Sequence, residues 1–325
     1  MSDSGGPSAA RRTVIIALAA NASIAVAKIV AGVASGSSAM LAEAAHSIAD
    51  TMNQVFLLFS LKLGERPPDA EHPFGHGKER FFWAFLAAVG IFIAGAGFSL
   101  YEGLHRIFGP PAEPGSFGVV YAVLGFALLA DGASLVRAWH QTRREASERR
   151  QPYASYVRAS RDPTTKTVLF EDSAAVIGVV MAFAGVAMFQ ATGNQVYDGL
   201  ASVAIGVLLA VVAVALGRDT KNLLIGEAAT PEEREAITEV IQANRGVDRV
   251  LELLTMALSP DRLLVAARVD LADGLSADEI ERASSEIDRE LRERIPTVWQ
   301  VFLDATPPRS EAARAPGGTP PADDA

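Results

Sequence analysis

The residues best suited to chemistry lie in an apolar stretch that reads Glu43-Ala-Ala-His46-Ser-Ile-Ala-Asp50. Ionisable groups inside a bilayer are costly to bury and usually functional. His46 and Asp50 are four residues apart, so one face of a helix presents both side chains in the same direction. An imidazole and a carboxylate are ready ligands for a divalent metal. The alternative is that His46 only forms a hydrogen bond between helices.

A second pair of acids, Glu171 and Asp172, opens another apolar stretch. The two acids are expected at membrane depth or near its edge, where they could bind the same metal. The alternative is that they only cap a helix, whose positive end favours acids. Three isolated membrane charges, Lys28, Asp131 and Asp198, are interpreted as packing or snorkelling groups.

A third cluster of potential ligands follows the first, in Asp69-Ala-Glu-His72-Pro-Phe-Gly-His76. Two histidines and an acid within eight residues, in a loop bent by proline and glycine, could bind a metal. The chain has no cysteine, so any metal site must use nitrogen and oxygen ligands.

Six apolar stretches are each long enough to cross a bilayer, which takes about 20 helical residues. Half of the 325 residues are hydrophobic, which is too apolar for an ordinary soluble pair of domains. The expected fold class is therefore an α-helical membrane protein. The predicted spans are Val14–Val33, Met40–Leu61, Phe81–Leu104, Phe117–Ala138, Val168–Phe189 and Val196–Leu216.

Lys and Arg are distributed unevenly among the segments that join these spans. The segment after the second span holds four of them, the stretch from Arg137 to Lys166 holds eight, and the N-terminal tail adds two. The three segments on the other side hold Arg106 alone. Because positive residues accumulate on the cytoplasmic side, both termini are predicted to be cytoplasmic.

Beyond the last span the sequence is typical of a water-soluble domain. Thr230-Pro-Glu-Glu233 and Ser276-Ala-Asp-Glu279 have the pattern of helix starts. Together with three β-type stretches they predict the order αββαβ, a small α+β sandwich. The predicted elements are a helix to Asn244, strands Val250–Leu258 and Leu263–Leu271, a helix to Arg294 and strand Val298–Leu303.

The predicted organisation has four parts. A disordered N-terminal tail (1–12) precedes the membrane domain (13–226), and the cytoplasmic domain (227–306) precedes a second disordered tail (307–325), rich in Pro, Ala, Gly and Asp. The net charge of −9 argues against a nucleic-acid partner, which requires clustered Lys and Arg.

Along nearly its whole length the chain resembles the cation diffusion facilitator family of zinc transporters, with six spans, cytoplasmic termini and a ferredoxin-like C-terminal domain. It is most similar to the branch with a mitochondrial zinc transporter of animals, which shares the His-Ser-x-x-Asp-x-x-Asn-Gln pattern that ends here at Asn53 and Gln54. The motifs that carry the resemblance are Gly36-Ser-Ser-Ala-Met-Leu-Ala-Glu43-Ala-Ala-His46-Ser-Ile-Ala-Asp50, His72-Pro-Phe-Gly-His76-Gly-Lys78 and Tyr197-Asp198-Gly-Leu-Ala-Ser202 with Ile205-Gly206.

The resemblance implies a tetrahedral transport site with two ligands from span two and two from span five. His46 and Asp50 match the first pair. In span five the family has His-x-x-x-Asp with a glycine six residues later, so Gly178 makes Asp172 the matching carboxylate.

The histidine of that motif falls on Val168, which cannot bind a metal. Either Glu171 or a water would then replace the missing ligand. Glu171 lies about 100° around the helix from Asp172, so it is expected to reach the site only if the start of the helix is irregular. Three oxygens with one nitrogen would be more permissive of manganese, iron or cobalt than a typical zinc site.

The resemblance further implies a homodimer that exchanges cytoplasmic Zn²⁺, as transported substrate, for external protons. Protonation of His46 would release the metal and deprotonation would admit it. Asp69, His72 and His76 match the family's second, cytoplasmic site. Residues 227–325 contain no His or Cys, so we expect no metal site there, only dimerisation.

Two other functions remain open. A membrane metalloenzyme could use His46 and Asp50 to activate water, but it lacks any further catalytic motif, so we expect the protein not to be an enzyme. A non-transporting metal-binding scaffold on the same fold is favoured by Val168. The short polar N-terminus has no organellar targeting stretch, so the expected location is a bacterial cytoplasmic membrane.

Overall fold

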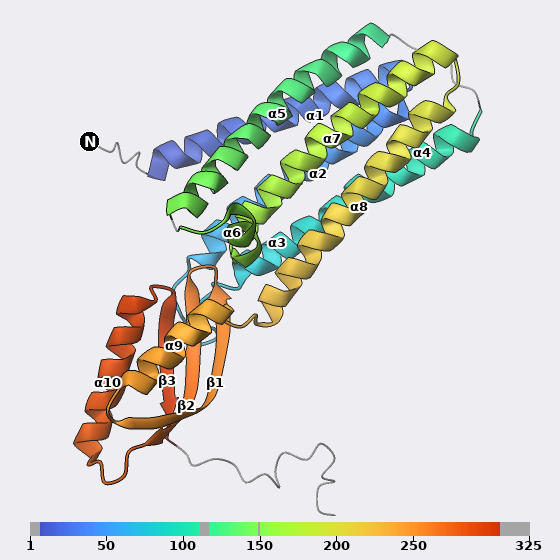
Figure 1. The fold of residues 1–325 in the computed structure, drawn as a ribbon. Coiled ribbons are helices and arrows are strands. Elements are labelled where there is room, and N and C mark those ends of the chain that lie inside the picture. Colours follow the sequence, from blue (N-terminus) through green and yellow to red (C-terminus); the bar gives the residue numbers. More distant parts are fainter. Residues whose placement is uncertain (1–6, 111–116, 149, 306–325) are drawn as a thin grey trace, which may run out of the picture. The chain divides into compact units, whose positions relative to one another are not determined.

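The computed structural model describes residues 7–110, 117–148 and 150–305, and it divides the chain into two compact units, Met1–Ile225 and Gly226–Ala325. Most of the first unit consists of long helices (Figure 1). Its elements are α1 (Pro7–Ser35), α2 (Ser38–Gly64), α3 (Glu79–Gly90), a π-helical segment (Ile91–Gly97), α4 (Phe98–Phe108), α5 (Phe117–Glu148), α6 (Tyr153–Ala159), α7 (Pro163–Thr192) and α8 (Val196–Ile225).

Four stretches of the described chain are long and apolar enough to cross a membrane: α3 to α4 taken together, α5, α7 and α8. They confirm four of the six predicted spans. In α1 the apolar part among the described residues, Asn21–Ser35, is shorter. In α2 the apolar sequence is interrupted by Glu43, His46 and Asp50. The first two spans therefore remain predictions.

Several helix boundaries differ from those predicted. The helix α1 already includes Pro7, the first described residue, inside the segment expected to be a disordered tail. The helix α7 begins at Pro163, five residues before the predicted start, with Asp162 as its N-cap. An apolar pattern marks the membrane part of a helix, and polar turns can extend it. The predicted tail 307–325 lies outside the described residues.

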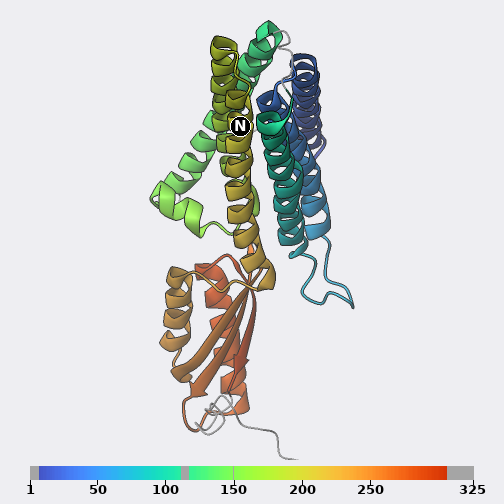
Figure 2. The ribbon, with the colours of Figure 1, turned by 90° about the vertical axis from the view of Figure 1, so that its right-hand side faces the viewer.

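The helices of the first unit pack closely through small residues. The helix α7 packs against α8, α5 and α2, and α4 packs along α8 (Figures 1 and 2). A Cβ atom added at Gly103 in α4 would lie 2.7 Å from the backbone nitrogen of Val203 in α8. Small residues let helix backbones approach in this way inside a membrane.

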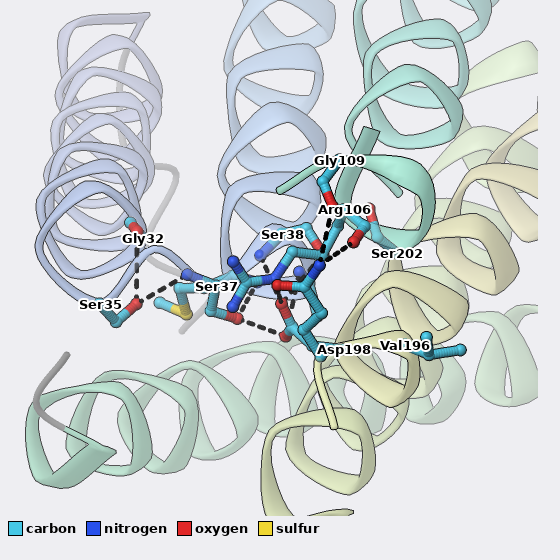
Figure 3. Close-up of polar contacts among 12 residues, drawn as sticks. Gly32, Ser35, Ser37, Ser38, Arg106, Gly109, Val196, Asp198 and Ser202 are labelled. Carbon is cyan, nitrogen blue, oxygen red and sulfur yellow. Dashed lines mark hydrogen bonds and ion pairs between the residues drawn. The ribbon is translucent and has the colours of Figure 1, made fainter. Parts of the chain in front are cut away.

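A fully buried carboxylate joins the ends of three of these helices (Figure 3). Asp198, in the first turn of α8, accepts hydrogen bonds from the hydroxyls of Ser37 (2.6 Å) and Ser38 (3.0 Å). It also accepts the backbone N–H groups of Ser38 (2.7 Å) and Ala39 (3.4 Å) at the start of α2. The Nε atom of Arg106, near the end of α4, lies 3.5 Å from the same carboxylate.

These five residues are termed the Asp198 cluster. A helix start has backbone N–H groups without intrahelical partners and a partial positive charge. The Asp198 carboxylate accepts hydrogen bonds from these N–H groups, and its negative charge compensates the partial positive charge. Asp198 therefore caps α2 from another helix. The prediction that this aspartate is an isolated packing or snorkelling group is therefore incomplete, because its side chain is fully buried and hydrogen-bonded.

The second unit has the predicted order of elements, two helices and a three-stranded sheet ordered β1-β2-β3. The strand β1 pairs antiparallel with β2, and β2 pairs parallel with β3 through the α10 crossover. Apolar residues of α9 and α10 bury one face of the sheet, including Val265 and Ala267. The elements are α9 (Pro231–Ala243), β1 (Val247–Ser259), β2 (Arg262–Leu271), α10 (Ala277–Arg294) and β3 (Val298–Asp304).

Both helices of the second unit start as the sequence predicts. Thr230 accepts a hydrogen bond from the backbone N–H of Glu233, and the Glu233 carboxylate accepts the backbone N–H of Thr230. Ser276 and Glu279 form the equivalent reciprocal pair at α10. Such a capping box satisfies backbone donors that a helix start leaves free.

Candidate metal centre

A polar cavity of about 220 Å³ lies among α1, α2, α5 and α7 of the membrane unit. Four carboxylates line it, one from α2, one from α5 and two from α7. They are termed the cavity carboxylates and are Asp50, Asp131, Glu171 and Asp172. The structure thus brings Asp50 together with both acids that the sequence analysis singled out 120 residues later.

On α2 the predicted pair lies as its spacing implies. The Nε2 atom of His46 is 3.5 Å from the Oδ2 atom of Asp50. His46 is only 1% exposed, and neither ring nitrogen has a hydrogen-bond partner among the described residues. Asp50 lines the cavity, whereas His46 lies one helical turn away and is not among the described residues that line it.

On α7 neither acid caps the helix, because the N-cap is Asp162, nine residues before Glu171. The Glu171 carboxylate is buried and accepts a hydrogen bond from the Nδ2 atom of Asn53 at 2.5 Å. Asp172 accepts one from the hydroxyl of Ser134 in α5 at 2.8 Å. The capping alternative is therefore wrong.

The structure also contradicts the expectation that Glu171 needs an irregular helix start. The helix α7 is continuous from Pro163 to Thr192, yet Glu171 and Asp172 both line the cavity. Adjacent residues point about 100° apart in a helix, so the cavity must border two faces of α7. Val168 lines it as well.

Asp131, which was interpreted from the sequence as a packing or snorkelling group, is a cavity residue that was not predicted. Asp131 lies on α5 three residues before Ser134, so both face the cavity. Lys28, which was given the same interpretation, does not snorkel. It is 1% exposed, and its Nζ atom lies 2.9 Å from the Glu43 Oε2 atom and 3.8 Å from the Asp131 Oδ2 atom. The Asp-x-x-Ser spacing in an apolar helix was the available signal.

Several buried polar atoms around the cavity have no hydrogen-bond partner within the described chain. Buried polar groups are normally satisfied, and unpaired buried charge is strongly unfavourable. A divalent cation would supply both charge and coordination, so these residues fit a metal. The atoms are Asp50 Oδ1, Gln54 Oε1, Asp131 Oδ2, Glu171 Oε1 and both ring nitrogens of His46.

The loop cluster has a tighter geometry. The ligand atoms of Asp69, His72 and His76 all lie within 4.8 Å of one another, and among the described residues this is the one such group of three or more. The ligands around the cavity are therefore spaced more widely, and metal binding there would draw them together.

Within the loop cluster, the Nε2 atom of His76 lies 2.9 Å from the Oδ2 atom of Asp69, and the His72 N–H donates to its Oδ1 atom at 2.6 Å. These hydrogen bonds, from His76 and then from the His72 backbone, lower the pKa of Asp69 to about 2. The cluster thus keeps an ionised carboxylate beside two imidazoles, which suits a divalent metal.

Comparison with known proteins gives matches to both units. Residues 14–225 match the family model described as the cation efflux transmembrane domain, and residues 229–307 match that of the cation efflux protein cytoplasmic domain. Together the two matches cover most of the chain.

Three curated relatives illustrate the range of similarity. The proton-coupled zinc antiporter SLC30A9, mitochondrial, of Xenopus laevis is 34% identical over 80% of this chain and 46% of its own. Metal tolerance protein C4 of Arabidopsis thaliana is 32% identical over 73% and 51%. The cation-efflux pump FieF of Serratia proteamaculans is 26% identical over 83% of each. The chain spans about half the length of the first two.

Proposed function

Because the chain belongs to the cation efflux family, also called the cation diffusion facilitators, we propose that it exports divalent metal cations, with zinc as the first substrate, in exchange for protons. The transport site is formed by His46 and Asp50 from α2 and by Glu171 and Asp172 from α7. The family is one of transporters, which agrees with the expectation that the protein is not an enzyme.

The observation that carries this proposal is the cavity in the membrane unit. Three of the four proposed ligands line it, from two helices far apart in the sequence. The fourth, His46, is buried beside Asp50 with both ring nitrogens free of hydrogen bonds to described residues. Such a group is unfavourable to retain in a membrane unless something binds it.

The donor set bears on which metal is transported. One nitrogen with carboxylate oxygens is compatible with zinc, and it also suits manganese, iron or cobalt. The relatives named as zinc antiporters favour zinc. The family motif has a histidine in span five where this chain has Val168, which cannot bind a metal. We propose that Glu171 replaces this missing ligand.

Proton exchange follows from the same ligands. Imidazoles and carboxylates bind either a metal or protons, and metal binding releases protons. When the metal leaves, the buried acids are most easily kept in the membrane by taking up protons, because burial disfavours their charged form. Alternating access of one cavity to the two sides then couples the two fluxes.

The architecture proposed for this function has six spans, α1 and α2 included, with both termini cytoplasmic and a ferredoxin-like second unit. The unequal distribution of Lys and Arg supports the orientation. The membrane is proposed to be a bacterial cytoplasmic membrane, although the relatives whose printed names give a location are mitochondrial.

We propose a homodimer formed through the second unit, whose family model is named for dimerisation. The pairing of the strands places Leu254, Ala266 and Phe302 in one row across the sheet. This row lies on the face opposite the helices, and Leu254 and Phe302 are 60% and 49% exposed. An apolar row of this kind could pack against a second copy.

A second candidate function is a non-transporting metal-binding scaffold on the same fold. The wide spacing of the cavity ligands and the valine at position 168 favour it. The compact loop cluster of Asp69, His72 and His76 would then be the principal metal site.

The test is uptake of zinc and manganese into proteoliposomes under an imposed pH gradient. We expect flux by the wild type and its loss in Asp50→Ala and Glu171→Ala, with Glu148→Gln, an exposed acid near the end of α5, as control. Loss of flux in Asp50→Ala alone would indicate that a water, and not Glu171, completes the ligand set. Flux retained in Asp50→Ala would refute the site, and no flux by the wild type would favour the scaffold.

A further inference from the structure

The unexplained features of the cavity are a carboxylate and a cation that the proposed ligand set does not use. Asp131, on α5, lines the cavity with Asp50, Glu171 and Asp172. Its Oδ2 atom is buried and accepts no hydrogen bond from any described residue. Its nearest charged partner in the described chain is Lys28 on α1, 3.8 Å away.

Lys28 has a firmer partner elsewhere. Its Nζ atom donates to the Glu43 Oε2 atom at 2.9 Å, and both side chains are nearly inaccessible. A Cβ atom added at Gly178 on α7 would overlap the Glu43 Oε1 atom, so α7 confines this carboxylate. Glu43 and Lys28 thus form a fixed ion pair beside the cavity, and Lys28 contacts Asp131 only loosely.

Glu171 gives independent evidence that the cavity awaits a ligand. It is 7% exposed, it lines the cavity, and its Oε1 atom has no hydrogen-bond partner in the described ranges. Asp131 lines the same cavity from α5. An oxygen ligand from α5 would therefore meet a cation held by α2 and α7.

We propose that Asp131 is a further ligand of the transported cation, contributed by α5 in addition to the ligands from α2 and α7. Lys28 is the fixed cation that faces Asp131 while the site is empty, and it competes with the metal for this carboxylate. The proposal rests on the proposed transport function and extends the ligand set to a third helix.

Competition by Lys28 has a consequence for affinity. A metal bound to Asp131 lies close to an ammonium group in a poorly screened environment, and like charges repel strongly there. Lys28 should therefore weaken metal binding and favour release. A site that binds the metal too tightly would release it slowly and would therefore slow transport.

The first test is zinc affinity of the purified full-length protein in detergent, measured by competition with a chromogenic zinc indicator. Asp131→Asn preserves size and leaves Lys28 paired with Glu43. We expect zinc binding weakened at least about tenfold, since even the loss of an outer-shell partner costs this much. Glu148→Gln neutralises an exposed acid on the same helix and should bind as the wild type does.

The second test removes the competing cation. Lys28→Met combined with Glu43→Gln eliminates both members of the pair, so no uncompensated charge is left buried. We expect tighter zinc binding in this double variant and no such gain when Asp131→Asn is also present. A gain that is independent of Asp131 would overturn the role assigned to Lys28.

The outcomes separate this inference from the function on which it rests. Wild-type affinity of the cavity site in Asp131→Asn, with that site lost in Asp50→Asn, would overturn the inference and leave the transport site in place. Absence of zinc binding by the wild type would instead refute the proposed function. If Asp131→Asn does not fold, Asp131→Glu decides, because a longer ligand must shift zinc affinity relative to manganese, and an unchanged ratio overturns the inference.

Discussion

Two groups of carboxylates in the membrane unit differ in how well they are satisfied. Asp198 accepts four hydrogen bonds and lies 3.5 Å from Arg106 (Figure 3). Among the cavity carboxylates, by contrast, Asp50, Asp131 and Glu171 each keep an oxygen without a hydrogen bond to a described residue. Both groups are acids on apolar helices, and the sequence does not distinguish Asp131 from Asp198.

The difference supports the proposal that one group stabilises the fold and that the other binds the transported metal. A saturated carboxylate stabilises the fold, because its charge is compensated by donors that would otherwise also be unsatisfied. An unsaturated group of like charges destabilises the fold and is kept where a ligand completes it. Substitutions in the two groups should therefore change stability in opposite directions.

The largest effect is expected at the Asp198 cluster. Asp198→Ala leaves Arg106 buried without its carboxylate and uncaps α2, which should cost about 3–5 kcal/mol. Thermal unfolding and size-exclusion chromatography in detergent would measure the loss. Asp219→Asn, a half-exposed acid of α8 paired with Lys166, is the control. An Asp198→Ala protein as stable as the wild type would remove the contrast between the two groups.

Asp50→Asn should do the reverse in the absence of metal. It removes one of several like charges around the cavity, so the unfolding free energy should rise by about 1 kcal/mol. Zinc should stabilise this variant less than it stabilises the wild type, because the cavity no longer binds the metal in the folded state. Thermal unfolding with and without zinc tests both points. A destabilised variant would mean that Asp50 is a structural residue like Asp198.

A substitution at Val168 would sharpen the account of the missing ligand. Val168 lines the cavity, so Val168→His adds a nitrogen donor where the family motif places one. We expect about tenfold tighter zinc binding and a smaller gain for manganese, which prefers oxygen ligands. Indicator competition for the two metals is the measurement, and Val168→Leu is the control. Equal gains for both metals would argue that position 168 does not contact the ion.

The smallest effect on transport is expected at the loop cluster. Asp69→Asn should abolish zinc binding by the loop, measured on protein that carries Asp50→Asn, and leave flux through the cavity unchanged. Flux that falls as far as in Asp50→Ala would contradict the separation of the two sites.

The loop cluster also has a defined response to pH. Its hydrogen bonds lower the pKa of Asp69 to about 2, below the value of the unfolded chain. The ionised form therefore stabilises the loop above a pH of about 4, and this contribution is lost as the pH falls toward 2. Zinc should leave the loop earlier, under mild acid, because histidines bind metals only when neutral. Zinc retained on the loop while Asp69 is protonated would contradict this order.

Much of the fold could be predicted from local patterns. The length of the apolar stretches predicted the four spans that the structure confirms. The capping boxes at Thr230 and Ser276 predicted where both helices of the second unit start. Polar turns that extend a helix beyond its apolar part show no such pattern. The start of α7 at Pro163 was therefore missed, although Asp162 followed by proline is a recognisable helix start.

Spacing alone predicted the candidate site only where its residues share a helix, and the combination with Glu171 and Asp172 was predicted from the family resemblance. The spacing of His46 and Asp50 places them together without knowledge of packing. Asp131 and Asp198 each stand alone in an apolar sequence, and only the packing of α5 and α8 against other helices distinguishes them. One faces a cavity and the other faces the start of α2.

The most direct test of the transport site is to locate the metal. Crystals of the full-length protein soaked in zinc and measured at the zinc absorption edge would give an anomalous difference map. We expect a peak in the cavity among the carboxylates of Asp50, Glu171 and Asp172, with zinc–oxygen distances of about 2.0–2.2 Å, and its loss in Asp50→Asn. A peak confined to the loop of Asp69, His72 and His76, with none in the cavity, would contradict it.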